Sequence, residues 1–184
     1  MSTLIGERKS MNTTIGNHLA KIALLATVTS VTVTLPLVQK VTAQSTYRLK
    51  TQFTGSNKCL DIINDGVNNQ PIMADCGNFS GQLWSVEPTE YSGYFRLKTQ
   101  FTGNNKCLDI VNDGINNQPR MADCGNFSGQ LWNIEATATP GFYRLKTQFT
   151  GNNKCLDIVN DGINNQPRMA GCGNFSGQLW NLSF

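Results

Sequence analysis

The chain has 184 residues, enough for one ordinary domain and a terminal extension. Lys and Arg number 15 and Asp and Glu 12; because four of the basic and one of the acidic residues precede position 44, residues 44–184 hold 11 of each and are neutral. A neutral domain without basic clusters has no electrostatic surface for nucleic acid, so we expect no nucleic-acid partner.

The N-terminal segment, residues 1–43, has the three parts of an export signal. Basic residues precede an apolar run over residues 22–38, and the small residues at 41–43 offer a cleavage position. An uncleaved membrane anchor is the alternative, but several Thr residues and Pro36 interrupt the run, and it is shorter than about 20 residues. The pattern therefore favours a cleaved signal peptide.

The export signal determines the expected domain boundaries and location. Met11 could equally be the true start, because the segment after it is a complete signal by itself. We predict a signal peptide over residues 1–43 and a mature domain over residues 44–184. This domain is expected to be secreted or periplasmic, without insertion into a membrane.

Comparison of the mature part with itself reveals three copies of one unit, with a period of 48 residues. Segments 96–133 and 144–181 agree at 37 of 38 positions and differ only at Asp123 against Gly171. Segment 48–85 agrees with 96–133 at 33 of 38 positions. The expected architecture is therefore threefold. The repeats span approximately residues 46–93, 94–141 and 142–184.

Each unit has the pattern of about four short β-strands. Apolar and polar residues alternate over residues 47–53, as in a half-buried strand. The unit continues with a short strand at 59–63, turn formers at 64–66, a returning strand at 71–76 and, after a Gly-rich loop at 77–81, the segment Gln82-Leu83-Trp84.

Twelve short strands in three similar units leave few architectures. A propeller usually has four to eight blades, and a solenoid needs terminal repeats that differ from the middle one. Closure of three units by threefold symmetry satisfies every unit and removes the sheet edges. We therefore predict an all-β fold, a β-trefoil of three near-identical 48-residue repeats with pseudo-threefold symmetry.

The six cysteines all lie in the mature domain, and an even number in an exported chain predicts disulfides. Two regular pairings are possible, within each repeat over 17 residues or between neighbouring repeats over 31. Pairing within a repeat is favoured, because a hairpin brings the two cysteines together at little entropic cost. The three pairs would be Cys59 with Cys76, Cys107 with Cys124, and Cys155 with Cys172.

A zinc site is not expected, because residues 44–184 contain neither a Cys-x-x-Cys sequence nor a histidine. We predict neither a metal nor a cofactor.

The segment Cys59-Leu60-Asp61, followed by Cys76 and then Gln82-Leu83-Trp84, resembles the repeated unit of ricin-B-type lectin domains. The same order recurs in the other two repeats. The resemblance implies a β-trefoil, one disulfide per repeat and up to three shallow sugar pockets. In this family the Asp accepts hydrogen bonds from sugar hydroxyls, although an Asp that only braces the hairpin is the alternative. The implied binding residues are Asp61, Asp109 and Asp157.

The sequence departs from the family at the aromatic platform, which lies two residues before the second cysteine. Alanine occupies that position in all three repeats, as Ala74, Ala122 and Ala170. Galactose specificity is therefore not predicted. A phenylalanine in the Gly-rich loop could replace the platform by stacking on a sugar, or could fold back as a lid on the core, and the lid is the favoured interpretation. These residues are Phe79, Phe127 and Phe175.

Side-chain amides supply further candidates for hydroxyl recognition. In the hairpin connections these are Asn69, Asn117 and Asn165. The glutamines of the Gln-x-Trp segments are also candidates, although their main expected role is to satisfy buried backbone groups, while the tryptophans fill the core. They are Gln82, Gln130 and Gln178.

Catalysis is not predicted. The only histidine, His18, lies in the expected signal peptide, and a hydrolase needs two carboxylates in different environments at one centre. The leading hypothesis is a secreted, monomeric protein that binds glycans or polysaccharide at up to three weak sites. The alternative is a trefoil scaffold for protein–protein contact whose sugar pockets are degenerate.

Overall fold

The computed structural model describes residues 45–67, 69–115, 117–163 and 165–184. These residues form twelve β-strands and three short 3₁₀ helices, so the expected all-β class is confirmed. The strands are β1 (Thr46–Thr51), β2 (Lys58–Ile62), β3 (Pro71–Asp75), β4 (Trp84–Pro88), β5 (Phe95–Thr99), β6 (Lys106–Ile110), β7 (Pro119–Asp123), β8 (Trp132–Ala136), β9 (Tyr143–Thr147), β10 (Lys154–Ile158), β11 (Pro167–Gly171) and β12 (Trp180–Ser183). The 3₁₀ helices are η1 (Ser80–Gln82), η2 (Ser128–Gln130) and η3 (Ser176–Gln178). The expected signal peptide over residues 1–43 lies outside the described residues.

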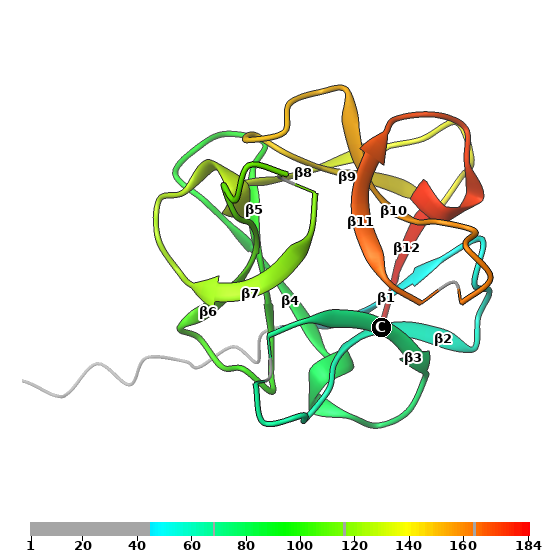
Figure 1. The fold of residues 1–184 in the computed structure, drawn as a ribbon, viewed down its shortest axis with the longest axis horizontal. Helices are drawn as coiled ribbons and strands as arrows, with labels where there is room; N and C mark the ends of the chain where they lie inside the picture. Colours follow the sequence, from blue (N-terminus) through cyan, green and yellow to red (C-terminus); the bar gives the residue numbers. More distant parts are fainter. Residues whose placement is uncertain (1–44, 68, 116, 164) are drawn as a thin grey trace, which may run out of the picture. The chain divides into compact units, whose positions relative to one another are not determined.

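Six of these strands close a barrel, and the other six form three hairpins. Around the barrel the order is β1-β12-β9-β8-β5-β4, and the last strand of the chain pairs with the first. The hairpins β2–β3, β6–β7 and β10–β11 follow one another around a common centre (Figure 1). Each repeat thus supplies two barrel strands and one hairpin, which is the predicted β-trefoil.

The first strand illustrates how sequence alternation produces the barrel. In β1, Leu49 and Thr51 are buried, whereas Arg48 and Lys50, which alternate with them along the strand, are half-buried. Successive side chains of a strand point to opposite faces, so every second residue enters the core. The predicted half-buried strand is therefore confirmed, and β5 and β9 repeat the pattern.

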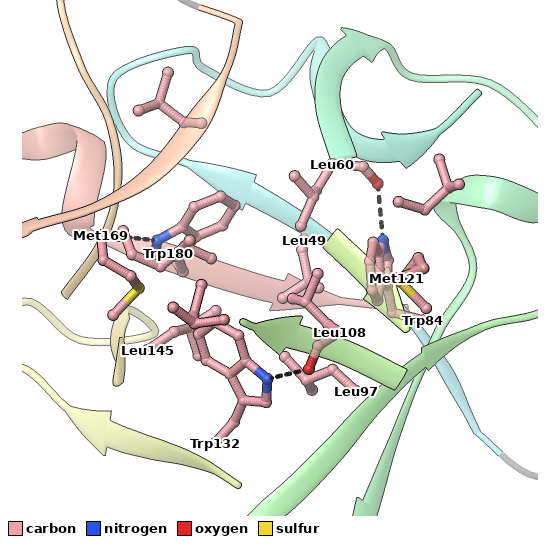
Figure 2. Close-up of a cluster of buried hydrophobic side chains, with 14 of the residues drawn as sticks. Leu49, Leu60, Trp84, Leu97, Leu108, Met121, Trp132, Leu145, Met169 and Trp180 are labelled. Carbon is pink, nitrogen blue, oxygen red and sulfur yellow. Dashed lines mark hydrogen bonds between the residues drawn. The ribbon is translucent and has the colours of Figure 1, made fainter. Parts of the chain in front are cut away.

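The core is built around three fully buried tryptophans, Trp84, Trp132 and Trp180. Each begins a barrel strand, and its indole Nε1 donates a 2.8 Å hydrogen bond to the carbonyl of a leucine in the hairpin of its own repeat (Figure 2). For Trp84 that acceptor is Leu60. The ring thus fills the core while its one polar atom joins barrel to hairpin, and loss of such a ring costs about 3–5 kcal/mol.

The three hairpins are also joined to one another by backbone hydrogen bonds. The Met121 N–H in β7 donates to the carbonyl of Asn69, in the hairpin connection of the first repeat, over 2.6 Å. The other two junctions repeat this bond cyclically, with Met169 donating to Asn117 and Met73 to Asn165. Each hairpin connection is therefore anchored on the next repeat.

Three disulfides close the hairpins, all within one repeat, as expected. They are Cys59–Cys76, Cys107–Cys124 and Cys155–Cys172, with Cα–Cα distances of 5.0 to 5.1 Å. Each joins the second residue of a hairpin's first strand to the residue just after its second strand. A crosslink over 17 residues stabilises the fold by about 3 kcal/mol in the chain-entropy treatment.

Candidate functional site

Each repeat carries one open pocket beside its hairpin, and a common set of residues lines all three pockets. We call them the first, second and third sites, and their cavity volumes are about 550, 780 and 760 Å³. The first site is lined by Asp61 at the end of β2, by the loop and turn residues Asn78 to Gly81, and by Asn64. The residues 48 positions further along the chain line the second site, and those 96 positions further line the third.

Every site also contains a phenylalanine from the next repeat, which the sequence reasoning missed. Phe101 of the second repeat lines the first site and Phe149 of the third repeat lines the second. Phe53 of the first repeat lines the third site, because the trefoil closes on itself. These residues follow barrel strands and pack against the core, so each pocket is shared by two repeats.

The Asp carboxylate at the floor of each pocket is held by a buried glutamine. Asp61 is 6% exposed, and its Oδ2 accepts a 2.9 Å hydrogen bond from Gln82 Nε2. The corresponding bonds, from Gln130 to Asp109 and from Gln178 to Asp157, are both 3.0 Å long. The structure therefore brings together the Asp and Gln of each repeat, two of the residue types that the sequence indicated.

The glutamines themselves have no exposed surface. Gln82 is 0% exposed: its Oε1 accepts from the Gly77 N–H at 2.9 Å, and its Nε2 also donates to the Asp75 carbonyl at 2.9 Å. Its amide is thus engaged with the backbone as expected, and it lies behind the carboxylate rather than beside it. We expected the glutamines among the ligand contacts, but burial leaves them only an indirect role, which holds equally for Gln130 and Gln178.

A glycine packs against the other oxygen of the carboxylate. A Cβ added to Gly81 in η1 would lie 2.2 Å from Asp61 Oδ1 and 2.3 Å from the carbonyl oxygen of Ile62. Only glycine allows the turn to approach the aspartate this closely. The same contacts occur at Gly129 and Gly177.

Burial raises the pKa of Asp109 and Asp157 above the ordinary value of 3.8. Desolvation is the largest cause, and the hydrogen bond from Gln130 or Gln178 and the charge of Arg120 or Arg168 oppose it. Burial has removed water from these carboxylates, and the protein replaces only some of the lost hydrogen bonds. Additional hydrogen-bond donors therefore stabilise the ionised form. These two carboxylates are therefore suited to accept hydrogen bonds from a ligand.

The loop phenylalanines are exposed, so the expected lid on the core is wrong. Phe79 is 60% exposed, and Phe127 and Phe175 are 61% exposed. The ring of Phe79 lies against Gly77, where an added Cβ would be 2.4 Å from its Cε2 atom. The backbone therefore supports the ring on one side, and the ring borders the pocket on the other.

The asparagines are distributed differently from the prediction. Asn69 lines the second site rather than the first, because its connection is anchored on the next hairpin. The amides that recur in all three sites are instead those of Asn64, which the sequence favoured as a turn residue, and of Asn78, together with their equivalents. The equivalents are Asn112, Asn126, Asn160 and Asn174.

Within the part of the chain that the structure describes, no helix is long and apolar enough to cross a membrane. Among the same residues, no group of three or more His, Cys, Asp and Glu side chains could hold a metal ion.

Comparison with solved structures shows the same fold in lectins and in a designed protein. The designed threefold-symmetric protein ThreeFoil matches 76% of this chain and 99% of its own, with 21% identity and a TM-score of 0.63. The ricin B-like lectin of Macrolepiota procera, solved in complex with lactose, matches 79% of this chain and 99% of its own, with 17% identity and a TM-score of 0.59. SeviL, solved bound to asialo-GM1 saccharide, matches 75% and 95% of the two chains, with 19% identity and a TM-score of 0.54.

In other matches the fold is part of a longer protein. A mosquitocidal holotoxin matches 78% of this chain with 18% identity and a TM-score of 0.65, but only 17% of its own chain is covered. No curated protein matches the sequence. At these identities the similarity shows the fold alone.

The family comparison is more specific. The model of the ricin-type β-trefoil lectin domain matches residues 45–140, which is more than half of the chain. These residues contain the Cys-Leu-Asp and Gln-Leu-Trp segments of the first two repeats, and the third repeat has the same segments at the same spacing. The chain therefore belongs to the family of ricin-type β-trefoil lectin domains.

Proposed function

We propose that the protein binds carbohydrate at three equivalent sites, one in each repeat, and catalyses no reaction. One observation carries the proposal: in each pocket a fixed carboxylate and an exposed phenylalanine ring border the same open cavity. A sugar presents an apolar ring face and a set of hydroxyls. An aromatic ring fits the first kind of surface and a carboxylate fits the second.

In the proposed complex at the first site, Asp61 accepts hydrogen bonds from sugar hydroxyls and Phe79 stacks on the sugar ring. Asn64 and Asn78, which line the same pocket, supply amides that can donate or accept. Gln82 makes no contact with the sugar and acts by holding the carboxylate. The same roles fall to the equivalent residues of the second and third sites.

The proposed sites are weak individually. Each pocket is open and bordered by one exposed ring, so a single sugar buries little surface and binds with a millimolar dissociation constant. Three sites on one rigid domain can engage a repeated glycan together, which raises avidity by roughly 10²-fold. We therefore propose glycans or polysaccharides with repeated units as the partners of a monomeric protein.

The composition of the first and third pockets supports a non-catalytic role. Among the described residues that line them, the first and third pockets contain one carboxylate each, Asp61 and Asp157. The second also contains Asp123, which forms a 2.9 Å ion pair with Lys106. A glycosidase needs two carboxylates placed on the two sides of the scissile bond.

We also propose export of the domain, with residues 1–43 as a cleaved signal peptide and residues 44–184 as the mature protein. Three disulfides among the described residues support it, because such crosslinks form and persist in oxidising compartments.

A scaffold for protein–protein contact is the second candidate. One observation favours it: the hairpin connections expose aliphatic side chains, with Val67 69%, Ile115 74% and Ile163 75% exposed. Exposed apolar groups mark interaction surfaces when they form one patch, and these three side chains recur at equivalent positions of the three repeats. A sugar-binding test distinguishes the two candidates, because the aliphatic residues do not line the pockets.

The deciding experiment is a broad glycan array on the refolded mature chain, followed by titration calorimetry. A monosaccharide unit of the best glycan and a polymer of that unit are titrated separately. The proposal expects millimolar binding of the monomer and a large gain for the polymer. Absence of binding to every glycan would favour the scaffold, and equal affinities for monomer and polymer would reject the trivalent site arrangement.

A further inference from the structure

The three sites share their binding side chains but differ in charge at two positions of the hairpin. The first position lies directly across the strand pair from the site aspartate. It is Ile72 opposite Asp61, Arg120 opposite Asp109, and Arg168 opposite Asp157. Cross-strand partners lie on the same face with Cβ atoms about 5 Å apart, so the arginines of the second and third repeats stand beside the carboxylate.

These arginines are available to a ligand. Arg120 and Arg168 are exposed and line the second and third pockets. Within the described residues, neither guanidinium makes a hydrogen bond or ion pair. Burial raises the pKa of Asp157 and Arg168 partly opposes that rise, so the cation is close enough to act on the site.

The second position lies at the far end of the same hairpin. Lys58 pairs with Asp75 at 2.8 Å and Lys106 pairs with Asp123 at 2.9 Å. In the third repeat Gly171 faces Lys154, which has no ion-pair partner among the described residues and is exposed. The one substitution between segments 96–133 and 144–181, Asp123 against Gly171, therefore removes an anion from the site and frees a cation.

The two differences act in the same direction. Counted over the site aspartate and these positions, the net charge is −1 in the first repeat, 0 in the second and +1 in the third. At the rim, Asn126 of the second pocket donates to Glu90 at 3.2 Å, whereas Ala138 occupies the equivalent position beside the third, so the third site is again less negative than the second. The barrel-strand arginines Arg48, Arg96 and Arg144 each donate to a glycine carbonyl beside their own site. Glu87 and Glu135 face Arg96 and Arg144 across the strand pair, whereas Ser183 faces Arg48, which reduces the difference between the first and third sites but keeps its sign.

We infer that the third site selects saccharides that carry a carboxylate or sulfate group, while the first site binds neutral saccharides. This inference rests on the proposed function and assigns a ligand class to one of its sites. In the complex at the third site, the sugar hydroxyls donate hydrogen bonds to Asp157 and the sugar ring stacks on Phe175, as they would with a neutral sugar. The anionic group meets Arg168, whose planar fork of N–H donors matches two oxygens of a carboxylate or sulfate.

The three sites belong to one chain, so ligand binding at all of them can be measured in one sample. The backbone amides of Phe79, Phe127 and Phe175 are followed by NMR in the mature protein during titration with lactose, a sulfated lactose and a sialylated lactose. We expect lactose to act similarly on all three amides. At least one anionic lactose should shift Phe175 at roughly tenfold lower concentration than Phe79. Which of the two does so identifies sulfate or carboxylate as the preferred group.

Two variants with natural precedents in the chain provide matched controls. Arg168→Ile gives the third site the residue of the first, and Ile72→Arg gives the first site the residue of the third, so neither change is foreign to this hairpin. We expect the first variant to abolish the preference at Phe175 and the second to create one at Phe79. Salt raised from about 50 mM to about 500 mM should weaken the preference and leave lactose binding unchanged.

The outcomes separate this inference from the proposed function. If neutral and anionic lactose act equally at Phe175, or if Arg168→Ile leaves the preference intact, the charge inference is overturned and sugar binding stands. If inorganic sulfate shifts Phe175 as strongly as the sulfated lactose, the site is an anion site without sugar recognition. If no saccharide here or on the glycan array binds at any site, the proposed function fails and the inference fails with it.

Discussion

Gln82 Nε2 and Asp61 Oδ2 are 2.9 Å apart, and this contact connects a fully buried glutamine of η1 to the floor of the pocket. Replacement of Gln82 by Ala leaves the Asp75 carbonyl and the Gly77 N–H unpaired and opens a cavity. We expect a loss of about 2–4 kcal/mol in the free energy of unfolding, measured by denaturant titration, together with loss of binding at the first site.

The control for Gln82→Ala is the same change at Gln130, where the bonds differ by at most 0.1 Å. Equal destabilisation in both repeats is expected. A stable Gln82→Ala variant that retains binding would show that the carboxylate does not need this partner.

A second prediction is that Gly81→Ala distorts the first site. The added methyl group would lie 2.2 Å from Asp61 Oδ1 and 2.3 Å from a backbone oxygen, so the aspartate or the turn must move. Calorimetry should show the affinity of that site falling by at least tenfold. Gly171→Ala is the matched control, because nothing lies within 4 Å of its Cβ position, and it should change stability by less than about 0.5 kcal/mol. Unchanged binding in Gly81→Ala would argue that Asp61 does not contact the sugar.

A third prediction separates binding from folding at Phe79. Because this ring is 60% exposed, Phe79→Ala should change the free energy of unfolding by less than about 1 kcal/mol. The same variant should lose roughly tenfold in sugar affinity at its site, and Phe79→Tyr should retain it. If Phe79→Ala unfolds the domain, the ring is needed for folding and the separation fails; if the variant binds sugar normally, the ring is not the platform.

The raised pKa values of Asp109 and Asp157 predict opposite pH dependences for binding and for stability. Binding needs the carboxylates, so affinity at the second and third sites should fall as pH drops through a value above 3.8. The folded state holds these protons more tightly than the unfolded state, so this contribution makes the free energy of unfolding decrease as pH rises through the same range. Calorimetry and denaturant titration between about pH 3 and pH 7 measure the two effects. The double variant Asp109→Asn with Asp157→Asn should lack both, and a profile identical to the wild type would reject the assignment.

The disulfide pairing predicts a simple peptide map. Digestion without reduction should join the peptide of Cys59 to that of Cys76, and likewise in the other two repeats. Removing one bridge with the pair Cys59→Ala and Cys76→Ala should lower the free energy of unfolding by about 3 kcal/mol. A major product that joins two different repeats would contradict the fold.

The sequence was sufficient to predict the trefoil, because the period of 48 residues and the alternation of residues 47–53 are local patterns. The disulfides were predictable for the same reason, since the hairpin already brings Cys59 and Cys76 together. The contributions of Phe53, Phe101 and Phe149 were not, because they come from the neighbouring repeat. Nothing local reveals which segments of two repeats meet.

The position of the loop phenylalanine was misjudged for a related reason. From the sequence, Phe79 could either stack on a sugar or fold back as a lid on the core, and the lid was favoured. Its actual support is the backbone of Gly77, a contact of the ring with its own loop that leaves the other side free. The structural role of Gln82 was expected, whereas its bond to Asp61 was not, since that bond depends on how η1 lies against β2.

The phenylalanine contributed by the next repeat has a consequence for how such a protein gains sites as it lengthens. A single repeat has no complete pocket, because the ring that completes it belongs to the following copy. Two joined repeats complete one pocket, and three in an open row complete two. Only when β12 pairs with β1 does Phe53 reach the third pocket, so the last duplication with ring closure adds two sites at once. A gene fragment of one or two repeats would have gained little from multivalency, whereas the closed ring gains all of it in one step.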